Sequence, residues 1–242
     1  MDTAVNYQKL ASKYGLAPAP ECVLRLTKLV AGQDSDMDEI ARVISGDPEL
    51  SARLLRVANP DAESEADHTV TTVEDALMRN GLGCVLLLAM STPLSLALVR
   101  TFQTMLSLSL TPINRRPRAE LHGEHLLGTI GFSGKAFGRV YLRLSLASAR
   151  LIASAILGMN PKELGDGAET RDAVGEVLNI MTGNFQSNMC DAGLDCRLTP
   201  PDVKRTSDLR TPRPPDCRLE CMAFGSGEIV LFVEIIVNPW NG

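Results

Sequence analysis

Four strand-like segments, grouped in two pairs around glycine-rich turns, limit the fold of this chain more than any other feature. In residues 138–145, apolar residues at the even positions alternate with Tyr141 and Arg143, which is the period of a half-buried strand. Residues 124–131 lie just before this segment, and residues 218–224 and 228–237 form the second pair. Because each pair is joined by a short turn, the sequence predicts two antiparallel hairpins in the C-terminal part.

The first 110 residues have a different pattern, with apolar residues at helical spacing throughout. The sequence predicts helices at 2–16, 21–30, 37–45, 48–58, 73–78, 85–90 and 93–106 in this part, and at 146–157 and 171–189 in the C-terminal part. The residues around Pro112 to Arg118 are expected to connect the two parts, and residues 191–215 to form a loop. The predicted fold class is α+β, with a helical domain at 1–90 followed by a domain at 91–242 that has an antiparallel sheet flanked by helices.

Composition and charge exclude several classes of function. The chain has 242 residues and a net charge of −5, and an acidic chain is a poor candidate for binding nucleic acid. None of the six cysteines forms a C-x-x-C pair, and the three histidines have no matching spacing, so no metal site is expected. Residues 85–99 are interrupted by polar residues and fall short of the ~20 residues that cross a membrane. No secretion signal is visible, so the expected location is cytoplasmic.

The helical part contains two short motifs, Asp47-Pro48-Glu49-Leu50 and Ala58-Asn59. With the run 73–82, they resemble the opening of an HDOD domain, a family related to HD phosphohydrolases that lacks their metal residues. The likeness covers less than a full domain, so this part is interpreted as a truncated copy. A spacer or dimerisation element and a partner-docking module are both left open for it.

The C-terminal part resembles the CheC, CheX and FliY phosphatase family over residues 93–240. The likeness is carried by the run 130–142, which resembles the family's hairpin, and by the segment 172–184, which resembles its signature helix. The family has an acidic residue or Ser, then Glu four residues on, then Asn three residues on. Asp172, Glu176 and Asn179 match these positions, whereas Pro200 and Pro201 fall slightly early for the proline that completes the pattern.

The spacing of these residues can also be argued from helix geometry. Steps of four, three and four residues place Asp172, Glu176, Asn179 and Gly183 along one helix face. An amide side chain donates and accepts hydrogen bonds at once, so Asn179 can hold a water molecule. We also expect Gly175 and Gly183 of this helix to allow close approach of a partner, because glycine is otherwise unfavourable there.

The resemblance implies hydrolysis of the aspartyl phosphate on a response-regulator receiver domain in a chemotaxis or two-component pathway. It makes Glu176 and Asn179 the catalytic residues, and Asp172, Gly183 and Asn184 are expected to contact the partner. No cofactor is expected in this chain, because the Mg²⁺ would belong to the receiver. A non-catalytic adaptor that binds through the same helix face is the alternative, a ligand-binding module has little support, and a homodimer is left open.

Overall fold

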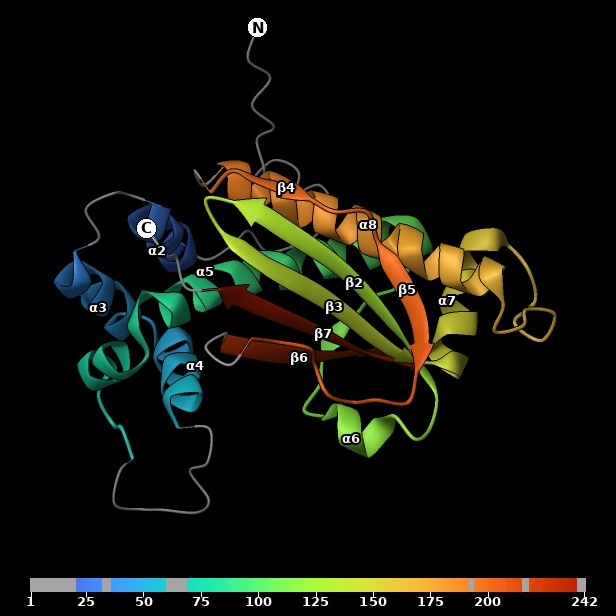
Figure 1. The fold of residues 1–242 in the computed structure, drawn as a ribbon, viewed down its shortest axis with the longest axis horizontal. Helices are drawn as coiled ribbons and strands as arrows, with labels where there is room; N and C mark the ends of the chain where they lie inside the picture. Colours follow the sequence, from blue (N-terminus) through green and yellow to red (C-terminus); the bar gives the residue numbers. More distant parts are fainter. Residues whose placement is uncertain (1–20, 32–35, 60–68, 192–193, 215–217, 239–242) are drawn as a thin grey trace, which may run out of the picture.

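The computed structural model describes residues 21–31, 36–59, 69–191, 194–214 and 218–238, and the helix expected at 2–16 lies outside them. A group of helices forms one end of the molecule, and a seven-stranded antiparallel sheet with further helices forms the other (Figure 1). The predicted fold class is therefore confirmed.

Three helices of the N-terminal part match the prediction, namely α2 (Glu21–Ala31), α3 (Met37–Ser45) and α4 (Pro48–Ala58). Asp36 and Asp47 cap α3 and α4, because each side chain accepts hydrogen bonds from backbone N–H groups of the first turn. Thr72 caps the next helix in the same way, with Asp75 N–H as the donor. The start signals in the sequence thus correspond to real helix N-termini.

Helix α5 (Val73–Leu106) differs from the prediction, because it continues through the break that was expected near residue 91. Pro93 lies inside it without ending it. The other expected break, between residues 78 and 85, does contain an interruption, at Gly81, where φ is 63° and ψ is −173°. A positive φ of this kind suits glycine, so the kink follows from that residue.

The two halves of α5 belong to different hydrophobic cores. Cys84, Val85 and Leu88 pack with α2, α3 and α4, whereas Leu94 and Phe102 pack in the core beneath the sheet. Residues 83–106 are apolar and long enough to cross a membrane, but 65% of the relevant window is buried inside the protein. Burial within the fold, rather than insufficient length, is therefore what argues against a membrane span.

The sheet has the strand order β1-β6-β7-β3-β2-β4, with β5 also paired to β2. Its long strands are β2 (His125–Gly134), β3 (Phe137–Ser145), β6 (Arg218–Ser226) and β7 (Ile229–Asn238). They form the two predicted hairpins, and the β3–β7 pairing joins the hairpins into one sheet.

The short elements were not predicted. Strands β4 (Cys196–Leu198) and β5 (Asp202–Thr206) lie in the region interpreted as loop, and both pair with β2. Strand β1 (Thr111–Pro112) pairs with β6, and the short helix α6 (Pro117–Glu120) follows it. The loop expectation is wrong for β4 and β5, because β2 supplies the hydrogen bonds that hold them extended.

Two helices cover the sheet together with the second half of α5, namely α7 (Leu146–Leu157) and α8 (Ala168–Asp191). Helix α8 packs closely on β2 at Gly128, where an added Cβ would lie 2.8 Å from Leu178 Cδ2. Phe185 of α8 also meets Phe132 of β2 edge to face, with ring centroids 5.9 Å apart. These contacts fix which side of α8 faces the core and which side faces solvent.

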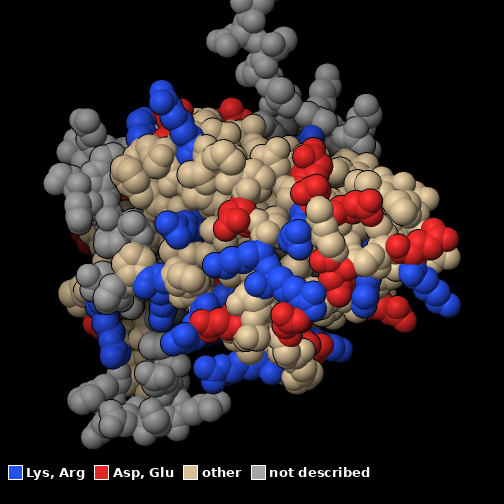
Figure 2. Space-filling model, turned by 45° about the vertical axis from the view of Figure 1, so that its right-hand side comes forward, with Lys and Arg blue, Asp and Glu red and all other residues tan. Residues whose placement is uncertain are grey.

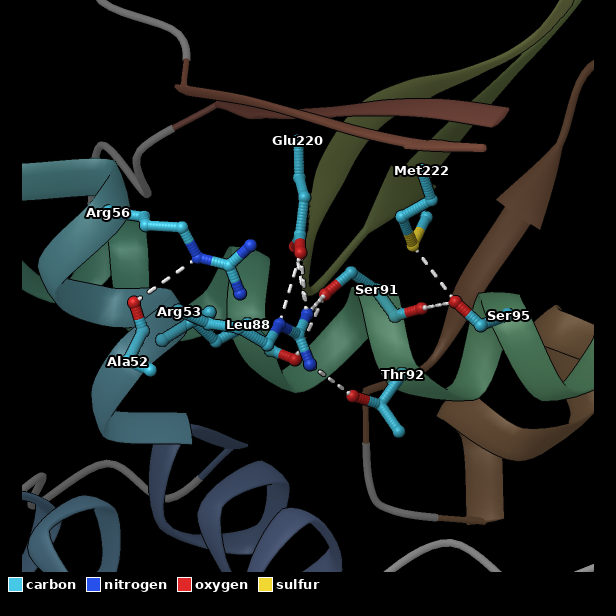
Figure 3. Close-up of polar contacts among 9 residues, drawn as sticks. All are labelled: Ala52, Arg53, Arg56, Leu88, Ser91, Thr92, Ser95, Glu220 and Met222. Atoms are coloured by element: carbon cyan, nitrogen blue, oxygen red, sulfur yellow. Dashed lines mark hydrogen bonds and ion pairs between the residues drawn. The ribbon is translucent and has the colours of Figure 1, made fainter. Parts of the chain in front are cut away.

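The N-terminal helices contact the sheet domain through polar groups at β6 (Figure 3). Arg53 of α4 forms an ion pair with Glu220 and also donates hydrogen bonds to Ser91 and Thr92 of α5. A turn further along α5, Ser95 lies 2.9 Å from the sulfur of Met222. Helix α5 and these side-chain contacts to β6 therefore join the two parts of the chain.

Candidate functional site

The predicted catalytic residues lie on the solvent-facing side of α8. Asp172, Glu176 and Asn179 are all exposed, whereas Val177 and Leu178 between them are fully buried. Along the helix axis, Glu176 and Asn179 are separated by about 4.5 Å, slightly less than one turn of the helix. The structure thus brings the three side chains onto one accessible face, as their spacing predicts.

Two further exposed residues extend this face at its ends, Glu169 before Asp172 and Ser187 after Gly183. Neither residue was predicted from the sequence, although the same spacing of three and four residues marks them. We call the surface formed by Glu169, Asp172, Glu176, Asn179, Gly183 and Ser187 the α8 face.

Strands β4 and β5 border one side of the α8 face. Gln186 donates a hydrogen bond of 2.6 Å to the carbonyl oxygen of Cys196, and Val203 lies against Gly175. These two contacts anchor β4 near the end of α8 and β5 near its start. The connection that contains Pro200 and Pro201 therefore runs beside the middle of the helix, where Asn179 lies.

The two glycines of α8 have different surroundings. Gly175 is buried, and a Cβ there would lie 3.5 Å from Val203 Cγ2, an ordinary contact. A Cβ at Gly183 would meet nothing within 4 Å. Only Gly183 thus leaves open space on the α8 face.

Asn184 lies at the edge of this surface and is only partly exposed. Its Nδ2 donates a hydrogen bond of 3.2 Å to Thr101 Oγ1 on α5. The side chain therefore links two helices within the domain. Its expected contact with a partner stays a prediction.

Charge is unevenly distributed around the α8 face. Figure 2 shows acidic side chains gathered toward the side on which α7 and the start of α8 lie, and basic side chains across the centre. The exposed acidic residues of α8 include Glu169, Asp172 and Glu176, and Lys204 and Arg205 are exposed on β5. The α8 face is thus suited to a partner with a cation opposite Glu176.

The described part of the chain offers no arrangement of three or more His, Cys, Asp or Glu side chains that could hold a metal ion. Near α8, burial is the main cause that raises the pKa of the Cys196 thiol, to about 11. A thiol with such a pKa stays protonated at neutral pH and is a poor nucleophile or metal ligand. The Cys196 thiol is therefore not a candidate reactive group beside α8.

Fold and site together define a two-part α+β protein, whose sheet domain presents a Glu and an Asn on one exposed helix. Residues 126–224 match the family described as Chemotaxis phosphatase CheX, and residues 16–110 match the HDOD domain. The chain thus has a CheX-like C-terminal domain preceded by an HDOD-like helical segment, as its motifs predicted. The HDOD match and helix α5 both extend past residue 90, and the predicted boundary there stays a prediction.

Solved structures support the same relationship. Chemotaxis protein CheX from Vibrio vulnificus is 26% identical, with a TM-score of 0.54 over 62% of this chain and 99% of that one. A CheC-like superfamily protein from Shewanella sp. PV-4 is 22% identical, with a TM-score of 0.55 over 62% and 97% of the two chains. CheX from Desulfovibrio desulfuricans is 17% identical, with a TM-score of 0.52 over 62% and 99%. The last two show the fold alone, and the comparison with curated proteins found no match.

Proposed function

We propose that this protein dephosphorylates the receiver domain of a response regulator, which docks on the α8 face. The observation that carries the proposal is the common exposure of Asp172, Glu176 and Asn179 on one side of α8. These residues lie within the segment that matches the CheX phosphatase family. The family match and the exposure of these side chains therefore both support the α8 face as the docking surface.

In the proposed reaction, the oxygen of a water molecule attacks phosphorus, and the bond from phosphorus to the receiver's aspartyl oxygen breaks. The products are inorganic phosphate and the free aspartate. Such a transfer requires a water molecule in line with the breaking bond and stabilisation of the charge on the moving phosphoryl group. The Asn179 amide would orient the water, since it both donates and accepts hydrogen bonds.

Glu176 would bind the partner rather than the water. Its carboxylate is exposed one turn from Asn179, where it can pair with a lysine of the receiver and fix the position of Asn179. The Mg²⁺ that neutralises phosphoryl oxygens would belong to the receiver. The proposed reaction would take place in the cytoplasm, as part of chemotaxis-type signalling.

The test follows the decay of phosphorylated receiver domains after addition of the full chain. Wild-type protein should accelerate the decay for at least one receiver. Asn179→Ala should reduce the acceleration by about 100-fold with little loss of binding, because water positioning is needed only for the chemical step. Glu176→Ala should weaken binding, and Glu49→Ala, at an exposed glutamate of α4 outside the α8 face, is the matched control.

The outcomes separate an enzyme from an adaptor. Binding without acceleration by the wild type would favour the adaptor. Equal acceleration by wild type and Asn179→Ala would remove Asn179 from the mechanism. If the wild type neither bound nor dephosphorylated any receiver tested, both interpretations of the α8 face would be wrong.

A further inference from the structure

A cavity lies where the start of β3 meets the loop after β5. It has a volume of about 420 Å³. Its lining comes from the strands (Phe132, Phe137, Gly138, Arg139 and Ile236) and from the loop after β5 (Pro212, Arg213 and Pro214). This volume is in the range of small-molecule sites. We call it the outer pocket.

Most side chains that line the outer pocket lie on the side of the sheet that α8 does not cover. On β3, Val140, Leu142 and Leu144 pack into the core that contains α8. Successive residues of a strand point to opposite faces, so Phe137 and Arg139 belong to the other face. A molecule in the outer pocket would therefore leave the α8 face free.

The loop wall of the outer pocket is held in place by buried polar groups. Arg143, which is fully buried, pairs with Glu234 and donates to the carbonyl oxygens of Asp208 and Arg210 at 3.1 and 3.0 Å. The Tyr141 hydroxyl donates to the carbonyl oxygen of Pro212 at 2.6 Å. Buried hydrogen-bond networks of this kind fix a segment in one arrangement, so the pocket is preformed.

Among the residues that the structure describes, those lining the outer pocket carry only positive charge. Arg139 and Arg213 are both exposed at it, and none of the described lining residues is acidic. Two described acids close to the lining in the sequence have partners, because Glu234 pairs with Arg143 and Asp208 pairs with Arg210. The two guanidinium groups thus favour an anion.

Phe137 adds an apolar surface beside these charges. Its side chain is 48% exposed, although it is a large aromatic residue on a strand. An exposed ring next to two arginines and two prolines offers a flat surface on which another ring can stack. The lining therefore combines anion recognition with stacking.

We propose that the outer pocket binds a small organic anion in which a phosphate or carboxylate group is attached to a flat ring. Arg139 and Arg213 bind the anionic oxygens, for which the planar guanidinium group is well matched. The ring lies against Phe137 and the proline wall. This site is independent of the proposed receiver-binding surface.

The experiment titrates the full chain with four probes, phenyl phosphate, benzoate, inorganic phosphate and phenol, and follows binding by calorimetry and by amide NMR shifts. Phenyl phosphate or benzoate should bind saturably, and comparison of the two identifies the preferred anion. Inorganic phosphate should bind more weakly because it lacks the ring, and phenol more weakly because it lacks the charge.

Variants connect the binding to the outer pocket. Arg139→Gln and Arg213→Gln should each weaken binding of the preferred probe by about tenfold, the loss expected for one charge-assisted hydrogen bond. Arg197→Gln, at another exposed arginine, is the control and should leave binding unchanged. The proposal is overturned if neither ring-bearing anion binds saturably, or if the control variant loses as much affinity as the two pocket variants.

Discussion

Arg53 and Glu220 are 167 residues apart in the chain, yet they form an ion pair with 2.8 Å between Nη2 and Oε1. The side chains are only 13% and 15% exposed, and Arg53 binds both carboxylate oxygens. Arg53 belongs to the HDOD-like helices and Glu220 to the sheet of the CheX-like domain. The pair is thus a direct connection between the two parts (Figure 3).

We predict that loss of this pair weakens the attachment of the helical part. Arg53→Ala and Glu220→Ala should each lower the free energy of unfolding by about 2 kcal/mol, because each leaves a partly buried charge without its partner. A double-mutant cycle by chemical denaturation should give a coupling of about 1–2 kcal/mol.

The exposed pair Arg25 and Glu39 is a matched control, with side chains 60% and 31% exposed. Its coupling should stay below about 1 kcal/mol, because solvent screens it. If the two pairs had equal coupling energies, burial would not strengthen the pair of Arg53 and Glu220.

The second prediction concerns the glycines of α8. Gly183→Ala should raise stability by up to about 1 kcal/mol, because alanine favours the helix and its methyl group meets nothing. The same methyl group projects from the α8 face, so receiver binding should weaken several-fold. Denaturation and binding assays on one preparation measure both effects.

Gly175→Ala provides the contrast. Its methyl group would make an ordinary contact with Val203 on the buried side of α8, so receiver binding should be unchanged. The expectation that both glycines serve close approach of a partner therefore applies only to Gly183. A larger binding defect in Gly175→Ala than in Gly183→Ala would contradict the proposed orientation of the receiver.

Local patterns in the sequence were sufficient to predict the hairpins and the arrangement of residues on the α8 face. The period of two in β3 and the steps of three and four from Asp172 to Gly183 depend only on backbone geometry. Helix α7 likewise begins and ends where predicted, at Leu146 and Leu157. The Ser145 side chain caps its start, and Gly158 ends it with a positive φ of 65°.

Features that depend on residues far apart in the sequence could not be predicted from local patterns. Strands β4 and β5 are too short to show a period, and their pairing with β2 involves residues more than 60 positions away. Arg143 was predicted as the polar position of a half-buried strand, yet it is fully buried, since Glu234 and backbone carbonyls satisfy its donors. Asn184 shows the same limitation, because its partner Thr101 lies 83 positions earlier.

The third prediction tests Asn184. Asn184→Ala should lower the free energy of unfolding by about 1 kcal/mol, the usual contribution of one hydrogen bond. Thr101→Val should cost little more in the Asn184→Ala background, because the bond between them is already lost. If Asn184→Ala instead weakened receiver binding without a change in stability, the residue would act on the partner, as the sequence alone suggested.

The last prediction concerns His125, a buried residue at the start of β2. Burial is the main cause that lowers its pKa below 6.5, and the charge of Arg143 acts in the same direction. The ring's Nε2 lies 3.1 Å from Arg143 Nη1, and its Nδ1 lies 3.3 Å from the carbonyl oxygen of Gly123. A neutral ring accepts from Arg143 and donates to Gly123, whereas a protonated ring would direct an N–H toward the guanidinium group.

Because the folded-state pKa is the lower one, the unfolded chain binds the proton first as the pH falls. The stability that depends on neutral His125 is thus fully present above about pH 6.5 and decreases below it, until the native ring also becomes protonated. The free energy of unfolding should therefore fall as the pH is lowered below about 6.5. His125→Gln retains an acceptor for Arg143 and does not titrate, so its decrease over the same range should be smaller. An equal decrease in the two proteins would assign the acid sensitivity to other groups, with the carboxylates around Arg143 the first to test.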